Sequence, residues 1–110
     1  AMTVLLLTHL DCLQHDMGEE HPESPERLRA VLRALDRQEF TELVRDQAVE
    51  ATREHLTRVH PADYVDAILG IRPPPGEIVA LDADTVMCHG SARAALLAAG
   101  AAVQAVDEVC

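Results

Sequence analysis

Residues 9–28 have the sequence HLDCLQHDMGEEHPESPERL, between a short apolar run and a segment with helical periodicity. The stretch contains three histidines, a cysteine and several carboxylates. Gly18 and Pro22 disfavour a helix, so we predict a loop over residues 9–24. Because polar side chains on a loop between rigid elements are a common setting for binding and catalysis, we expect function to be located here.

The run before this loop, residues 3–8 (TVLLLT), is short, continuous and apolar. Such runs are typical of a strand that is buried on both faces of a parallel sheet. We predict a strand there, a second strand at residues 47–51 and a short extended segment at residues 78–81.

The segment after the loop carries the signals of a helix start. Ser24 is a good N-cap, Pro25 suits the first helical position, and the carboxylate of Glu26 is favourable in the first turn. Apolar side chains then recur at helical spacing, with arginines on the opposite side. We therefore predict a helix over residues 25–37.

The remaining segments complete the predicted order of elements. We expect a helical turn at residues 40–44, a helix that Thr52 caps, and another over residues 61–70, from its opening proline to its closing glycine. Three consecutive prolines exclude a helix at residues 71–76, and the alanine-rich residues 91–109 favour one. Strands that alternate with helices predict an α/β fold with a parallel sheet. Two strands cannot close such a sheet, so we interpret the sequence as part of a domain.

The composition limits the classes of function. The chain has 110 residues, of which 48% are apolar and only 2% aromatic, so its core must be aliphatic. Nine basic residues against nineteen acidic ones give a net charge of −10. This charge argues against a nucleic-acid partner, because such binding needs a basic surface. We interpret the negative charge as a contribution to solubility. The alternative is that it attracts cationic substrates, but the carboxylates are spread along the chain.

The cysteines and the apolar runs indicate the compartment. The three cysteines, Cys12, Cys88 and Cys110, show neither zinc-ribbon spacing nor the pattern of a secreted disulfide framework. Residues 4–7 are too short an apolar run for a signal peptide or a membrane span. We expect a cytoplasmic protein that does not contact a membrane, and we interpret residues 1–2 as partly a cloning remnant.

Four segments of the chain, in order, resemble the zinc-dependent deacetylases of the histone deacetylase and acetylpolyamine amidohydrolase superfamily, nearest its class II and bacterial members. The segments are residues 15–28 (HDMGEEHPESPERL), 51–65 (ATREHLTRVHPADYV), 81–85 (LDADT) and 94–109 (AALLAAGAAVQAVDEV). The resemblance covers nearly the whole chain, and the order of the segments makes it more specific than any one of them.

The resemblance implies a fold and an activity. The fold is the arginase/deacetylase-type three-layer α/β/α fold with a parallel sheet, of which residues 1–110 resemble the N-terminal segment of the catalytic domain. The activity is hydrolysis of acetyl-lysine or acetylpolyamine amides by a zinc-dependent amidohydrolase. The family's tandem histidines, Asp-x-His zinc motif and active-site tyrosine follow further along its sequences, and the first two motifs do not occur here. We therefore expect zinc in the full-length protein, no catalytic residue or zinc ligand in this segment, and no activity from the segment alone.

The resemblance also implies roles at the rim of the active site. The loop over residues 9–24 would border the entrance, with His21, Pro22 and Glu23 beside the substrate. Arg27 would line an internal channel behind the metal, which suits a guanidinium because it binds carboxylates in a bidentate way. The alternative for Arg27 is an arginine on the helix surface in an ion pair.

Residues 71–90, with the proline-rich and Asp-x-Asp-Thr loops, would contribute a second part of this rim. In the family, a carboxylate of such a loop accepts hydrogen bonds from the substrate; here Asp84 is the first choice and Asp82 the second. The alternative is a structural Asx turn or N-cap, which aspartate and threonine also favour.

A second, structural zinc occurs near the first loop in some class II relatives. The ligands that we consider for such a site are His9, Cys12, His15 and Cys88, because the His-x-x-Cys-x-x-His spacing is compatible with tetrahedral zinc. The alternative is a set of loop histidines with local hydrogen bonds and a buried cysteine.

Two other functions compete with an enzyme. One is a truncated deacetylase relative that acts as a binding or oligomerisation module without catalysis. Its open sheet edges and apolar helix faces would invite a homo-oligomer, and a strictly monomeric chain in gel filtration would count against it. The other is a metal-sensing domain built on the four histidine and cysteine residues, which would bind zinc stoichiometrically.

Overall fold

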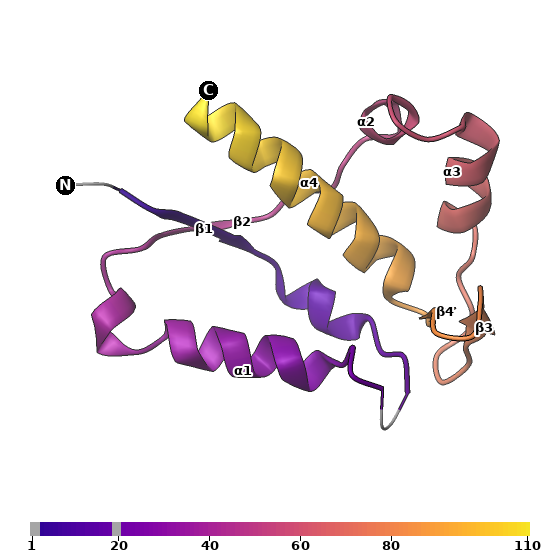
Figure 1. Cartoon of the computed structure of the whole chain (residues 1–110), viewed down its shortest axis with the longest axis horizontal. Coiled ribbons are helices and arrows are strands. Elements are labelled where there is room, and N and C mark those ends of the chain that lie inside the picture. The colour runs from indigo at the N-terminus through magenta and orange to yellow at the C-terminus, as the bar shows by residue number, and fades with distance from the viewer. Residues whose placement is uncertain (1–2, 19–20) are drawn as a thin grey trace.

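A computed structural model describes residues 3–18 and 21–110 of the chain (Figure 1). The expected cloning remnant at residues 1–2, and residues 19–20 of the predicted rim loop, lie outside the described residues. The elements, in chain order, are β1 (Leu5–Thr8), the 3-10 helix η1 (Leu10–Gln14), α1 (Pro25–Leu35), the 3-10 helix η2 (Gln38–Phe40), β2 (Val44–Gln47), α2 (Arg53–Thr57), α3 (Ala62–Leu69), β3 (Val79–Ala80), β4 (Val86–Met87) and α4 (Ser91–Val109).

The first two strands pair in parallel, as predicted. β1 lies beside β2 in a register that sets Leu5 opposite Val44. The Val4 carbonyl accepts the Val44 N–H at an N···O distance of 2.9 Å, and the Thr8 carbonyl accepts the Ala48 N–H at 2.8 Å. The connection contains η1, α1 and η2, so the unit is a βαβ crossover. The predicted α/β fold is confirmed, and β3 and β4 form a separate antiparallel hairpin.

The second strand begins earlier than predicted. The sequence predicts a strand at residues 47–51, whereas β2 ends at Gln47. The rest of the predicted segment lies along α4, where the Ala51 N–H donates to the Leu96 carbonyl at 2.9 Å. Its backbone therefore finds a partner on a helix far along the chain instead of on a strand. The helical turn predicted at residues 40–44 also lies earlier, at η2, which ends at Phe40. The last residue of the predicted turn, Val44, is already the first residue of β2.

The α-helices begin close to the predicted positions, whereas the 3-10 helix η1 lies inside residues 9–24, where the sequence predicts a loop. α1 begins at Pro25 but ends at Leu35, before the predicted end at residue 37, and Ser24 takes the N-cap position without a capping side-chain hydrogen bond. Thr52 caps α2 in a capping box: its side chain accepts the His55 N–H, and the His55 ring accepts the Thr52 N–H. α4 spans the range that the alanine-rich sequence predicts.

α4 is the centre of the packing. Figure 1 shows it crossing the middle of the molecule, with α1 on one side and α2 and α3 on the other. It packs against η1 and β1. Its buried side chains include Ala92, Ala94 and Leu97, and Leu97 is the largest side chain that is fully buried, with 1% exposed. A core of small aliphatic side chains agrees with the low aromatic content.

Two glycines allow other segments to approach α4 closely. A Cβ built on Gly100 would lie 1.7 Å from the Val49 carbonyl oxygen, and one built on Gly90 would lie 2.3 Å from Gln14 Cβ. Cβ atoms cannot approach neighbours so closely, so both positions require a residue without one. These glycines let the segment after β2 and the end of η1 pack directly against α4 and the turn before it.

The strands are less buried than predicted. The sequence predicts a strand buried on both faces at residues 3–8, but β1 is only half-buried and β2 is exposed at each position. The Cα radius of gyration is 15.5 Å, whereas a compact domain of about this length has about 13 Å. The described chain is therefore an open arrangement around α4.

Candidate active-site rim

Two segments that the resemblance assigns to the rim meet in the structure. His21 belongs to the loop before α1, and Asp84 belongs to the turn between β3 and β4. The His21 Nε2 atom lies 3.0 Å from the Asp84 carbonyl oxygen, although 63 residues separate them in sequence. This contact ties the first part of the predicted rim to the second.

The hydrogen bonds of His21 define its tautomer. Nδ1 accepts the backbone N–H of Glu23 at 3.0 Å, so Nδ1 carries no proton. A carbonyl oxygen can only accept, so the proton lies on Nε2, which donates to the Asp84 carbonyl. Both ring nitrogens are thereby occupied by contacts within the protein.

The two aspartates of the β3–β4 turn have different surroundings. Asp82 Oδ1 accepts the Asp84 N–H at 2.8 Å, which forms an Asx turn. This N–H, followed by the Thr85 hydroxyl, holds the pKa of Asp82 below its usual value. Within the described residues, the exposed Asp84 carboxylate has no hydrogen-bond or ion-pair partner. The structural alternative therefore describes Asp82, and the Asp84 carboxylate is available to a ligand.

A cleft of about 590 Å³ opens beside the His21 contact. Among its lining residues, from η1, the rim loop and the first turn of α1, are Gln14, Asp16, Gly18, His21, Ser24 and Glu26. His21 faces this cleft, whereas the exposed Pro22 and Glu23 are not among the residues that line it. Of the three loop residues predicted beside the substrate, only His21 borders the cleft.

A second cleft, of about 390 Å³, also borders the rim loop. Asp16 and Gly18 line both clefts. The second cleft continues along residues 75–78 and residues 88–90. The proline-rich segment is therefore a direct neighbour of the rim loop.

Arg27 has features of both interpretations that the sequence leaves open. Its side chain is 59% exposed and lies 3.8 Å from the Glu23 carboxylate, one helical turn away, as the ion-pair alternative predicts. It also borders a cavity of about 340 Å³, together with Cys12, His15 and Ser91. The guanidinium is thus at the mouth of a cavity between α1 and α4 rather than enclosed within it.

The four residues considered for a structural zinc do not converge. His9 Nδ1 accepts the Asp11 N–H at 3.0 Å, and His15 Nδ1 lies 2.6 Å from the Ser91 hydroxyl. In residues 3–18 and 21–110, no group of three or more His, Cys, Asp or Glu side chains could hold a metal ion. Among the described side chains the four residues therefore form no metal-binding group: His9 bonds within its own turn, and His15 pairs with Ser91, 76 residues along the chain.

The two cysteines of this set have opposite pKa shifts. Burial, followed by the charge of Asp11, raises the pKa of the Cys12 thiol. Burial alone would also raise the pKa of Cys88, but hydrogen bonds from the Ser91 hydroxyl and the Asp16 N–H outweigh it and lower that pKa. Cys88 Sγ also donates to the Gln14 carbonyl at 3.0 Å. Cys88 therefore connects the end of η1 to the start of α4.

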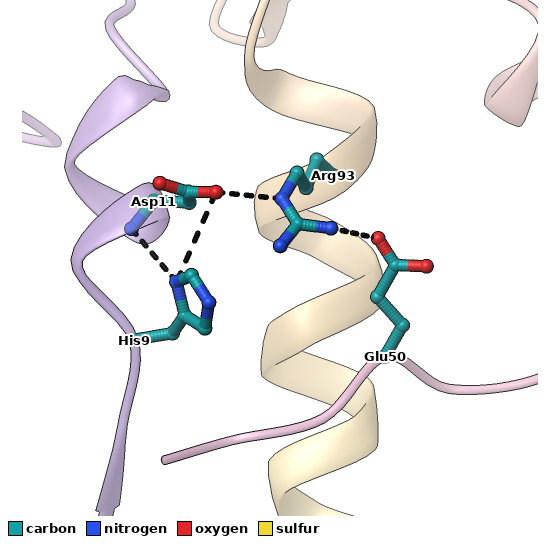
Figure 2. A network of polar contacts seen from close by, with 4 residues as sticks. All are labelled: His9, Asp11, Glu50 and Arg93. Carbon is teal, nitrogen blue, oxygen red and sulfur yellow. Dashed lines mark hydrogen bonds and ion pairs between the residues drawn. The ribbon is translucent and has the colours of Figure 1, made fainter.

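Arg93 forms a polar network that the sequence does not reveal (Figure 2). From α4 its Nε donates to Asp11 Oδ2 at 2.6 Å, and its Nη1 forms an ion pair with Glu50. His9 Nδ1 lies 3.9 Å from the same Asp11 oxygen. The hydrogen bond from Arg93 holds the pKa of Asp11 below its usual value. The network joins η1, α4 and the segment after β2 to one another, and the end of η1 lines the cleft of about 590 Å³.

Comparison with known proteins identifies the family. Residues 21–110 match the model of the histone deacetylase domain. A probable deacetylase of Archaeoglobus fulgidus is 32% identical over 98% of this chain, which covers 30% of that protein. Type-2 histone deacetylase 1 of Dictyostelium discoideum is 32% identical over 56% of this chain, which corresponds to 4% of its own length.

The fold agrees with this match. The crystal structure of the HDA15 HD domain superposes with a TM-score of 0.79 and 29% sequence identity, covering 94% of this chain and 31% of that one. The chain therefore spans less than a third of the length of each of these relatives. Its parallel strands, its helices and its match to the domain model agree with one another, and the chain belongs to the histone deacetylase family.

Proposed function

We propose that this chain forms the first part of a zinc-dependent deacetylase domain whose whole protein hydrolyses acetyl-lysine or acetylpolyamine amides. Family membership supports the reaction class. The contact between His21 and the Asp84 carbonyl is the observation that carries the proposal, because it joins the two predicted rim segments beside a cleft. The chain would supply the first strands, the outer helices and the entrance rim.

The role of the rim would be to hold the substrate, not to react with it. The exposed carboxylate of Asp84 would accept a hydrogen bond from an N–H group of the substrate, and such a bond is stronger than one between two neutral groups. Catalytic zinc sites use three protein ligands, and the described residues form no such group. The resemblance places the family's tandem histidines, zinc ligands and active-site tyrosine further along the domain, so the role that we propose for this chain is contact with the substrate at the rim.

The test is a deacetylase assay of this chain beside the longer protein, meaning this sequence followed by the rest of its deacetylase domain. We expect the longer protein to release acetate from an acetyl-lysine peptide or an acetylpolyamine, to stop after chelation and to recover with zinc. We expect no release by the 110-residue chain. Zinc-dependent turnover by the chain alone would overturn the proposal that the catalytic residues lie in the rest of the domain. An inactive longer protein would overturn the proposed reaction.

A second candidate function, self-association without catalysis, is favoured by one observation. β2 is exposed along its length, and Val44, Val49 and Val59 are 48%, 57% and 78% exposed. Exposed strand edges and apolar side chains promote pairing between copies. Sedimentation of the chain at increasing concentration, together with an assay of the longer protein, decides this alternative. A chain that dimerises and a longer protein without deacetylase activity would support it. A chain that stays strictly monomeric would contradict it.

The location that we propose is the cytoplasm. Cys12, Cys88 and Cys110 are all free thiols, which fits a reducing compartment. No helix in residues 3–18 and 21–110 has the length and apolarity needed to cross a membrane. Fractionation of cells that express the longer protein tests this location.

A further inference from the structure

We propose that His21 is a positioning residue, which holds the turn that carries Asp84 at the substrate entrance and does not itself contact the substrate. The inference rests on the proposed function, because it assumes that the Asp84 carboxylate accepts a hydrogen bond from the substrate. It changes the role of His21, which the resemblance places beside the substrate.

The ring of His21 has no hydrogen-bonding capacity left for a ligand. Its Nδ1 accepts the Glu23 N–H and its Nε2 donates to the Asp84 carbonyl, each at 3.0 Å. A substrate that bonded to either nitrogen would have to break one of these contacts. The ring still borders the cleft, so it shapes the wall without offering a free polar atom.

The turn that carries Asp84 depends on this contact for its position. Its internal bonds, from the Leu81 N–H to the Thr85 carbonyl at 2.8 Å and from the Asp84 N–H to Asp82, set the shape of the turn but not its place in the molecule. In the described ranges, the bond from His21 is the one hydrogen bond that joins residues 81–85 to a segment outside the β3–β4 hairpin. The hairpin has only two residue pairs, so its tip would move if the bond were lost.

Two substitutions separate the two contacts of the ring. In His21→Gln, the terminal amide nitrogen reaches the place of Nε2 and can donate to the Asp84 carbonyl. In His21→Asn, the shorter side chain can accept the Glu23 N–H in place of Nδ1 but cannot reach Asp84. Both variants carry a side-chain amide. Only His21→Gln keeps the contact with Asp84, and only His21→Asn keeps the contact with Glu23.

The experiment measures steady-state kinetics of the longer protein with an acetyl-lysine peptide. We expect His21→Asn to raise KM on the order of tenfold, because the displaced Asp84 carboxylate would lose its hydrogen bond to the substrate, and a bond to a charged group has about this effect. The kcat should stay within about twofold of wild type. His21→Gln should restore most of the wild-type KM. Because His21 acts through Asp84, adding His21→Asn to Asp84→Asn should produce no further increase, whereas a direct contact with substrate would give additive effects.

A spectroscopic measurement tests the geometry without any variant. The 15N shifts of the His21 ring in the 110-residue chain should show the Nε2–H tautomer, and an Nδ1–H tautomer or a freely exchanging ring would overturn the inference. An unchanged KM in His21→Asn, or additive effects with Asp84→Asn, would also overturn it while leaving the deacetylase assignment intact. A wild-type longer protein without deacetylase activity would instead refute the proposed function, and the inference with it.

Discussion

Replacing Gly100 with alanine should lower the free energy of unfolding by about 2 kcal/mol or more, a cost typical of forcing extra atoms into a packed site. In an isolated helix the same change is favourable by about 0.5–1 kcal/mol. Here the new methyl carbon would lie 1.7 Å from the Val49 carbonyl oxygen and 2.6 Å from the Ala51 nitrogen. These are backbone atoms that cannot rotate away, so α4 and the segment after β2 must separate.

Urea unfolding followed by circular dichroism measures this effect. Ala102→Ser is the matched control, because it adds one atom at an exposed position of the same helix and should cost about 0.5 kcal/mol or less. Separation of the two segments should also make the Ala51 amide exchange faster, since its bond to the Leu96 carbonyl would be strained. A Gly100→Ala variant more stable than wild type would show that this segment does not pack against α4.

Replacing Leu97 with alanine should cost about 3 kcal/mol, within the range measured for buried leucines. Leu97 is 1% exposed, and four of the other six buried apolar residues in the described part of the chain are alanines. No other side chain of its size is fully buried in the described residues, so the cavity would have few large neighbours to fill it. Such a loss is a large part of the stability of a small domain.

Unfolding of Leu97→Ala is best compared with that of Val106→Ala. Val106 lies in the same helix but is 59% exposed, so its truncation should change stability by about 0.5 kcal/mol or less. Both variants report on α4, and only burial distinguishes them. Equal stabilities for the two would mean that α4 does not bury the face on which Leu97 lies.

The elements that the sequence predicts well are those that local chemistry determines. α4 follows from a long run of alanine and leucine, and the start of α1 follows from Pro25 and the residues around it. The parallel pairing of β1 and β2 follows from an apolar strand, a helix and a second strand in succession. The prediction that His21 and Asp84 belong to the rim comes from a resemblance to a family, not from periodicity.

The features that sequence reasoning missed depend on contacts between distant residues. β2 ends at Gln47 because later backbone groups bond to α4, as when the Val49 N–H donates to Gln104 Oε1 at 3.2 Å. Arg93 lies in an apolar helix, and its partner Asp11 is 82 residues away. A single arginine among alanines was the available signal for an ion pair between segments, but no nearby residue identified its partners.

The most direct test of the central claim, that β1 and β2 begin the sheet of a deacetylase domain, is amide hydrogen exchange at Leu5 and Leu7. The carbonyls of Val4 and Thr8 bond to β2, and alternate residues of a strand direct their polar groups to opposite neighbours. The amides of Leu5 and Leu7 therefore face away from β2. We expect both to exchange fast in the 110-residue chain and to be strongly protected in the longer protein. Fast exchange in both proteins would contradict a sheet that continues beyond β1.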